Sequence, residues 1–150
     1  MAEAPKTPAA TGDSPRATTS TDSTRGRELF VSKGCVLCHS INGVGGRAGP
    51  PLDAPADGAS DPVDFAARIW RGAPAMVELQ SLELGYVIDL TSEEIRLLAA
   101  FAGSRSEQAL LSKDDLPSSL ADAVLDEDFW RAEDWREFLR NGQELTDTEE

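Results

Sequence analysis

The sequence predicts an all-α fold with three main helices and a C-terminal helical extension. Two helix-start signals support this prediction. Asp61 followed by Pro62 is typical of an N-cap and first helical position, and Thr91 with Glu94 matches the S/T-x-x-E pattern of a capping box. Apolar residues follow both signals at helical spacing, and no segment reads as a convincing strand.

The first helix is expected to run from Thr24, its N-cap, to Val36, with Phe30 on its apolar face. A glycine-rich loop over residues 42–49 follows and closes on two prolines. We expect irregular chain there rather than a strand.

The second helix is expected over residues 62–71. Gly72 and Pro74 should end it, because proline lacks the N–H of a helical hydrogen bond. A loop carrying Met76 should come next. The third helix should begin after Thr91, and a glycine at position 103 is a suitable stop.

Composition divides the chain of 150 residues into three regions. Residues 1–24 are polar and too poor in large apolar side chains to offset the entropy of ordering, so we expect a disordered linker. Residues 25–103 should form the main domain. Residues 104–150 should form an acidic helical extension, with helical pieces at 117–125 and 128–140.

Charge is distributed unevenly over these regions. The formal net charge is −13, of which −1, −3 and −9 fall on the first, second and third regions. This acidity argues against nucleic acid and anionic membrane surfaces as partners, and it favours a protein partner with a basic patch. The alternative is that the acidic residues only keep the extension soluble.

The N-terminal region has no apolar core of the kind that a signal peptide requires. No segment approaches the roughly 20 apolar residues of a membrane span. We therefore expect either that an export signal or anchor has been removed or that the chain begins as written.

The strongest local signal is the run Cys35-Val36-Leu37-Cys38-His39. The C-x-x-C-H spacing is typical of covalent attachment of a c-type haem. The two thiols form thioethers with the haem vinyl groups, and the adjacent histidine then lies under the ring plane, where it can bind the iron. The sequence thus predicts one covalent haem c held by Cys35, Cys38 and His39.

Three other interpretations of Cys35, Cys38 and His39 are considered. A zinc site needs about four ligands, so the two cysteines and the only histidine would require carboxylates to complete it. A thioredoxin-like pair would need a βαβ setting, which the sequence lacks. A structural disulfide across two intervening residues would be strained.

The chain resembles the class I c-type cytochromes over about residues 25–103. Gly26 and Phe30 precede the haem motif, as a glycine and an aromatic residue do in the first helix of that family. The segment from Thr91 to Phe101 resembles the C-terminal helix that crosses the first helix. The resemblance implies a contact between Phe30 and Phe101.

The run Gly49-Pro50-Pro51-Leu52 resembles the Gly-Pro-x-Leu segment of that family. There the proline carbonyl accepts a hydrogen bond from the haem-ligating histidine, and the leucine packs on the ring. The resemblance therefore implies that Pro50 orients His39 and that Leu52 contacts the haem.

The run Gly72-Ala73-Pro74-Ala75-Met76 resembles the family's Gly-x-x-x-Met stretch, which implies that Met76 is the sixth iron ligand. Taken alone, a single methionine in a loop is ordinarily gap-filling core. With haem as cofactor, the chain has no second histidine for the other axial position. Val77 stands where the family usually has a proline, so a labile Met–iron bond is a hypothesis.

Trp70, Arg68 and Arg71 are candidates for contacts with the haem propionates, because an indole N–H or a guanidinium would offset carboxylate charge. The alternative is a core tryptophan beside two solvated arginines.

Taken together, the residues predict a monohaem c-type cytochrome that transfers single electrons between redox proteins in a bacterial periplasmic chain. The resemblance implies this compartment, because the family attaches haem outside the cytoplasm. No catalytic residue and no small-molecule substrate are expected, and membrane contact is expected only through a removed anchor.

Two alternatives remain open. The protein could be a haem subunit docked permanently on a dehydrogenase or reductase, with aromatic anchors at Phe129, Trp130, Trp135 and Phe138. It could instead be a ligand-binding or catalytic haem protein with a displaceable Met76. We favour an extension that packs on its own haem domain over one that docks on a partner, because exposed apolar helices are costly.

Overall fold

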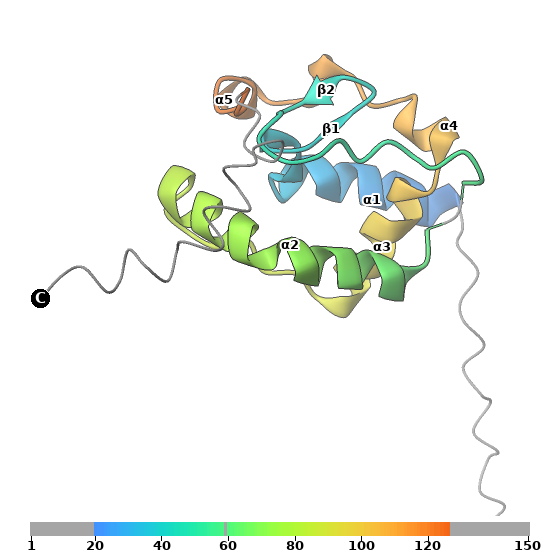
Figure 1. The fold of residues 1–150 in the computed structure, drawn as a ribbon. Helices are drawn as coiled ribbons and strands as arrows, with labels where there is room; N and C mark the ends of the chain where they lie inside the picture. Colours follow the sequence, from blue (N-terminus) through green and yellow to red (C-terminus); the bar gives the residue numbers. More distant parts are fainter. Residues whose placement is uncertain (1–19, 59, 127–150) are drawn as a thin grey trace, which may run out of the picture.

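The computed structural model describes residues 20–58 and 60–126, which form a mostly helical fold (Figure 1). Its elements are α1 (Ser20–Ser32), the 3-10 helix η1 (Cys35–Leu37), β1 (Ser40–Ile41), β2 (Val44–Gly45), α2 (Pro62–Glu83), α3 (Ser92–Ala102), α4 (Arg105–Gln108), the 3-10 helix η2 (Lys113–Asp115) and α5 (Ser118–Ala121). The predicted all-α class is confirmed, with one small hairpin added. None of the described helices combines the length and the apolarity needed to cross a bilayer.

Helix α1 starts before the predicted position. Thr24 is not an N-cap: it lies one turn inside the helix, where its hydroxyl donates to the carbonyl of Ser20 at 3.0 Å. The first turn is held by a tertiary contact, because the buried Asp22 carboxylate accepts from the Arg96 guanidinium of α3 at 2.9 Å. The prediction of a disordered linker is therefore wrong for residues 20–24, and residues 1–19 lie outside the described part.

Helices α1 and α3 pack directly against each other at Gly26. A Cβ at this position would lie less than 3.0 Å from the Leu97 carbonyl group and from Cβ of Phe101. The predicted aromatic contact is present one turn further on, where the Phe30 and Phe101 rings lie 5.6 Å apart. Both rings are buried in the main apolar core.

The predicted caps of α3 are confirmed. The Thr91 hydroxyl accepts from the backbone N–H of Glu94 at 3.2 Å, and the Glu94 carboxylate accepts from the Thr91 N–H at 2.9 Å. Gly103 ends the helix as its C-cap. This reciprocal capping fixes the start of α3 by local interactions.

A short hairpin occupies part of the loop for which we predicted irregular chain. Strands β1 and β2 pair in antiparallel register, with Ile41 opposite Val44. Asn42 and Gly43 between them have φ values of 50° and 77°. Positive φ at both turn positions is the signature of a type I′ turn, for which Asn-Gly is strongly preferred.

Helix α2 is twice as long as predicted. Its start is as expected, since the Asp61 side chain accepts from the N–H groups of Val63 and Asp64 and proline occupies the first position. The helix does not stop at Gly72 and Pro74, however, and continues to Glu83. Met76 consequently lies in a helix, not in the predicted loop.

The continuation has a physical cause. Pro74 removes one backbone hydrogen bond, which costs about 3 kcal/mol in a helix interior. The apolar stripe that begins with Phe65 and Ile69 nevertheless carries on at helical spacing through Met76 and Leu79, all of which are at least partly buried. The amphipathic pattern of the sequence thus runs on through Pro74, and the helix follows it.

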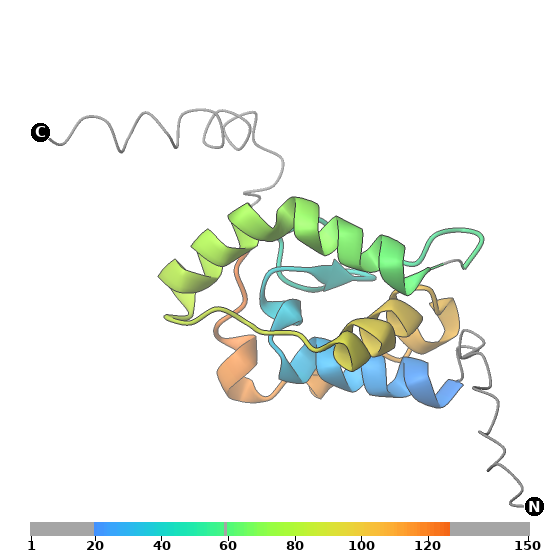
Figure 2. The same cartoon turned by 90° about the horizontal axis from the view of Figure 1, so that it is seen from below.

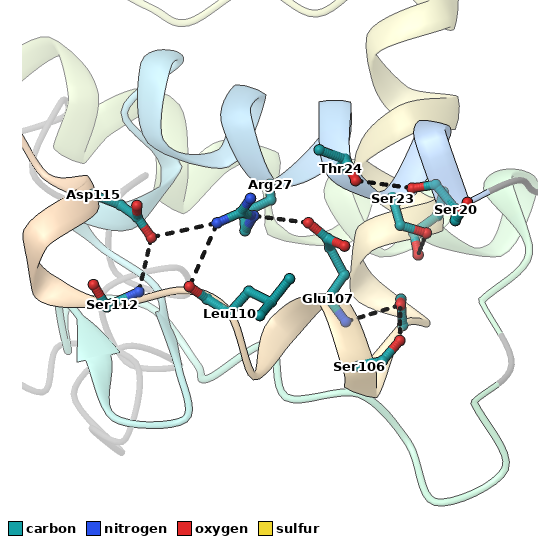
Figure 3. Close-up of polar contacts among 11 residues, drawn as sticks. Ser20, Ser23, Thr24, Arg27, Ser106, Glu107, Leu110, Ser112 and Asp115 are labelled. Atoms are coloured by element: carbon teal, nitrogen blue, oxygen red, sulfur yellow. Dashed lines mark hydrogen bonds and ion pairs between the residues drawn. The ribbon is translucent and has the colours of Figure 1, made fainter.

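Residues 104–126 belong to the same packed unit as the helices before them. Leu111 is buried in the main core, and Leu116 and Leu120 pack against it. Figure 3 shows the polar part of this contact, in which Arg27 of α1 pairs with Glu107 at 2.8 Å and with Asp115 at 3.6 Å. The described part of the extension therefore packs on its own domain.

Two helical pieces were predicted within the extension. The helical piece expected at 117–125 is the single short helix α5. The piece expected at 128–140, with the aromatic anchors proposed for it, lies outside the described residues.

Candidate haem site

The C-x-x-C-H motif sits on one tight turn directly after α1. Gly34, with φ of 85°, breaks the helix and allows the chain to turn into η1. The backbone N–H groups of Cys38 and His39 both donate to the carbonyl of Cys35, at 3.3 and 3.0 Å. The turn thus fixes both cysteines and the histidine relative to one another.

The His39 imidazole is oriented by the Pro50 carbonyl, whose oxygen lies 2.7 Å from Nδ1. A carbonyl oxygen only accepts, so Nδ1 carries the proton and Nε2 keeps its lone pair. Burial lowers the pKa of His39, and the hydrogen bond to Pro50 opposes this shift in part. Within the described residues no hydrogen bond reaches Nε2, which leaves it as a metal-ligating atom.

Gly49 lies directly against the same ring. A Cβ at this position would come within 3.0 Å of three ring atoms of His39. The Gly49 N–H also donates to the carbonyl of Cys38 at 2.6 Å. The glycine before Pro50 therefore lets the chain pass close to the imidazole.

Cys35 and Cys38 are both free thiols and both partly buried. Burial raises the pKa of Cys35 to about 11 and also raises the pKa of Cys38. Protonated thiols do not suit a thioredoxin-like pair, which works through a stabilised thiolate. Across residues 20–58 and 60–126, no group of three or more His, Cys, Asp or Glu side chains is arranged to hold a metal ion, so a zinc site gains no support.

Leu52 and Met76 lie on different elements around this motif. Leu52 is partly buried against the main core, and its N–H donates to the carbonyl of Ser40 at 2.9 Å. Met76 is half-buried in α2, on the face that carries Phe65 and Ile69. Figure 2 shows α2 alongside the segment that contains η1 and the hairpin.

The family model for cytochrome c matches residues 23–105. The chain belongs to the cytochrome c family. The match spans more than half of the chain, from α1 through the C-x-x-C-H motif to the end of α3. Proteins of this family bind haem c covalently and carry electrons. Searches among curated proteins and among solved structures gave no significant match.

The donor set of this cytochrome fits a covalent haem. It offers two free thiols at the attachment spacing and one neutral imidazole with an unengaged Nε2. It also offers an apolar surface: of the 22 residues of α2 only Phe65 is fully buried, while Ile69, Met76 and Leu79 on the same face are covered only in part. A flat apolar cofactor is suited to covering such a face.

The structure does not bring Trp70 into the core. Trp70 is 80% exposed, so the alternative of a core tryptophan is wrong. The guanidinium of Arg68 lies over the Phe65 ring, 5.6 Å from its centroid. Propionate contacts from Trp70, Arg68 or Arg71 stay a prediction.

Sequence reasoning missed two contacts to the haem-binding segments. Gln108 hydrogen-bonds the chain beside Leu52, and nothing in its sequence context signals this role. Leu125 forms two backbone hydrogen bonds, with the Leu37 carbonyl at 2.9 Å and the Arg47 N–H at 2.7 Å. The hairpin after His39, by contrast, was detectable from its Asn-Gly pair.

Proposed function

We propose that this cytochrome is a monohaem electron carrier in which His39 and Met76 ligate the iron. The hydrogen bond from His39 Nδ1 to the Pro50 carbonyl is the observation that carries the proposal. It fixes the tautomer that presents Nε2 to a metal, one residue after the second attachment cysteine.

The haem of this family supplies one-electron chemistry when bound. The residues of the chain provide its setting. Cys35 and Cys38 anchor the macrocycle, His39 donates Nε2, and the Pro50 carbonyl raises the basicity of the imidazole. Met76 would supply the second protein ligand to the iron, and a methionine ligand would leave no open position for a substrate and would raise the reduction potential.

The acidic residues of the C-terminal region favour a protein partner with a basic docking patch. Leu125 is hydrogen-bonded to Leu37, inside the haem motif. From this point the sequence continues into residues 127–150, which contain nine acidic and three basic residues. Acidic charge that follows Leu125 in the sequence would steer encounters with a basic partner, and such encounters weaken with salt.

The periplasm is the proposed compartment, because the family to which the chain belongs attaches its haem outside the cytoplasm. Expression of the chain behind a periplasmic export signal should give covalent haem, and cytoplasmic expression of the same chain should give none. Equal haem attachment in both compartments would contradict this part of the proposal.

The visible and near-infrared spectrum of the matured protein tests the ligands. We expect low-spin bands in both oxidation states and a weak near-infrared band from the Met76–iron bond. Met76→Ala should abolish that band, and Leu79→Ala, on the same face of α2, should leave it intact. A wild-type protein that is high-spin and lacks the band would exclude Met76 as ligand.

A second candidate function is favoured by the helical position of Met76. The methionine lies inside α2 and is followed by valine, so the chain lacks the proline that stiffens the ligand loop in this family. A displaceable Met76 would open the iron to small ligands. Rapid binding of carbon monoxide by the reduced native protein at neutral pH would favour this function, and negligible binding would favour electron transfer.

A further inference from the structure

Gln108, at the end of α4, is one of the most deeply buried side chains of the protein, with 2% of its surface exposed. Its Oε1 accepts from the N–H of Ala54 at 2.8 Å. Its Nε2 donates to the carbonyls of Leu52 and Ala102, at 3.0 and 3.3 Å. One amide thus ties the chain at 52–54 to the C-terminal end of α3.

This segment is the continuation of the one that orients His39. Pro50, whose carbonyl accepts from the imidazole, lies two residues before Leu52. On its N-terminal side the segment is held by the hydrogen bond from Gly49 to Cys38. On its C-terminal side it is held by Gln108, together with the bond from the Leu52 N–H to Ser40. The position of the Pro50 carbonyl is therefore fixed from both sides.

We propose that Gln108 is a positioning residue for the haem ligand His39, and that it acts through the Pro50 carbonyl. This inference rests on the proposed ligation by His39. Hydrogen bonds weaken steeply as donor and acceptor lose alignment. The strength of the Nδ1–H bond sets the basicity of the imidazole, and ligand basicity tunes the reduction potential. Gln108 lies beyond residue 105, where the family match ends, so the extension supplies this control.

The test compares Gln108→Met with Leu111→Ala in the full-length haem protein. Methionine keeps the length of the side chain and removes all three hydrogen bonds. Leu111 is a buried core residue of the same extension, and in the described part of the chain no hydrogen bond joins it to the 52–54 segment, so Leu111→Ala is a control for lost stability.

Gln108→Met should speed solvent exchange of the His39 Nδ1 proton in the reduced protein by about tenfold, the order expected when one hydrogen bond of ordinary strength is weakened. It should also raise the reduction potential, because a less basic imidazole stabilises the oxidised iron less. A tenfold change in the one-electron equilibrium constant corresponds to about 59 mV. Leu111→Ala should lower the unfolding temperature and leave both quantities unchanged.

The inference is overturned if Gln108→Met changes neither quantity, or if Leu111→Ala changes them equally. If Gln108→Met does not fold with haem attached, the test is hydrogen exchange of the wild-type protein in mild denaturant. The Ala54 N–H and the His39 Nδ1 proton should then lose protection together, and a His39 proton that stays protected after Ala54 has opened overturns the inference. Failure of the proposed function is seen separately, as a wild-type protein whose His39 resonances carry no signature of iron ligation.

Discussion

Replacing Gly26 by alanine should destabilise the protein, although alanine favours a helix over glycine by about 1 kcal/mol. The new Cβ would overlap the carbonyl group of Leu97 and Cβ of Phe101. These are backbone and near-backbone atoms of α3, which cannot rotate away. Helix α1 would have to move, and the 5.6 Å contact between Phe30 and Phe101 would loosen. Overpacking typically costs about 1–3 kcal/mol, and overlap with backbone atoms puts this site at the upper end, so after the propensity gain we expect a net loss of about 2 kcal/mol.

Gly72→Ala is the matched control, because Gly72 also lies inside a helix. The nearest atom to its added Cβ is Cε of Met76 at 3.5 Å, an ordinary contact with the flexible end of a side chain. The helix propensity gain should therefore survive, and we expect stabilisation by about 0.5–1 kcal/mol.

Denaturant unfolding of the haem-loaded variants, followed by far-ultraviolet circular dichroism, measures both changes. Thermal unfolding should show them as shifts of opposite sign, at about 4–8 °C per kcal/mol for a domain of this size. If both substitutions shift stability in the same direction, close packing of α1 on α3 is not what requires glycine at position 26.

Three further results are expected. The pKa of Glu94 is lowered mainly by the hydrogen bond from the Thr91 N–H and further by Lys33. The ionised Glu94 carboxylate should therefore stabilise the protein above pH 4.5, and this stabilisation should be lost as the pH falls through the lowered folded-state pKa. Glu94→Gln should flatten the acid limb of stability in a pH series of unfolding curves. Asp22→Ala should lower the free energy of unfolding in denaturant by about 2 kcal/mol. This is less than the roughly 3–5 kcal/mol of a fully buried pair, because Arg96 keeps its contact with the Glu93 carboxylate. An unchanged free energy of unfolding would mean that the pair is energetically neutral. Truncation after Gly103 should lower the unfolding temperature far more than truncation after Asp126, since only the first removes Gln108 and three leucines of the core, and equal effects would contradict the packing described.

Local interactions were predictable from the sequence. The caps at Asp61 and Thr91 depend on residues two to three positions away, and both form as expected. The Asn42-Gly43 turn was equally local, and it was missed because the glycine-rich composition of the whole loop outweighed the turn signal. The length of α2 was not predictable in this way, since the helix follows the apolar stripe through Pro74 despite the local cost of the proline.

The candidate haem site shows the same difference between local motifs, which the sequence reveals, and contacts between distant segments, which it does not. The run of the two cysteines and His39 identified the haem motif by itself, and the resemblance to cytochromes supplied the hydrogen bond between His39 and Pro50 that the structure contains. Gln108 could not be found, because its three partners are backbone groups brought together only by folding. A buried glutamine in a short helix carries no signal of what it will contact.

The pairing of α1 with the end of the domain also determines when the chain can fold. Asp22, Ser23 and Arg27 contact residues that lie 74, 77 and 80 positions later in the sequence. Helix α1 therefore lacks its main partner, α3, until synthesis has passed residue 102, and its apolar face stays open to other proteins until then. The cysteine motif follows α1 directly, so the thiols that we propose as haem attachment points stay in unpaired chain for the same interval.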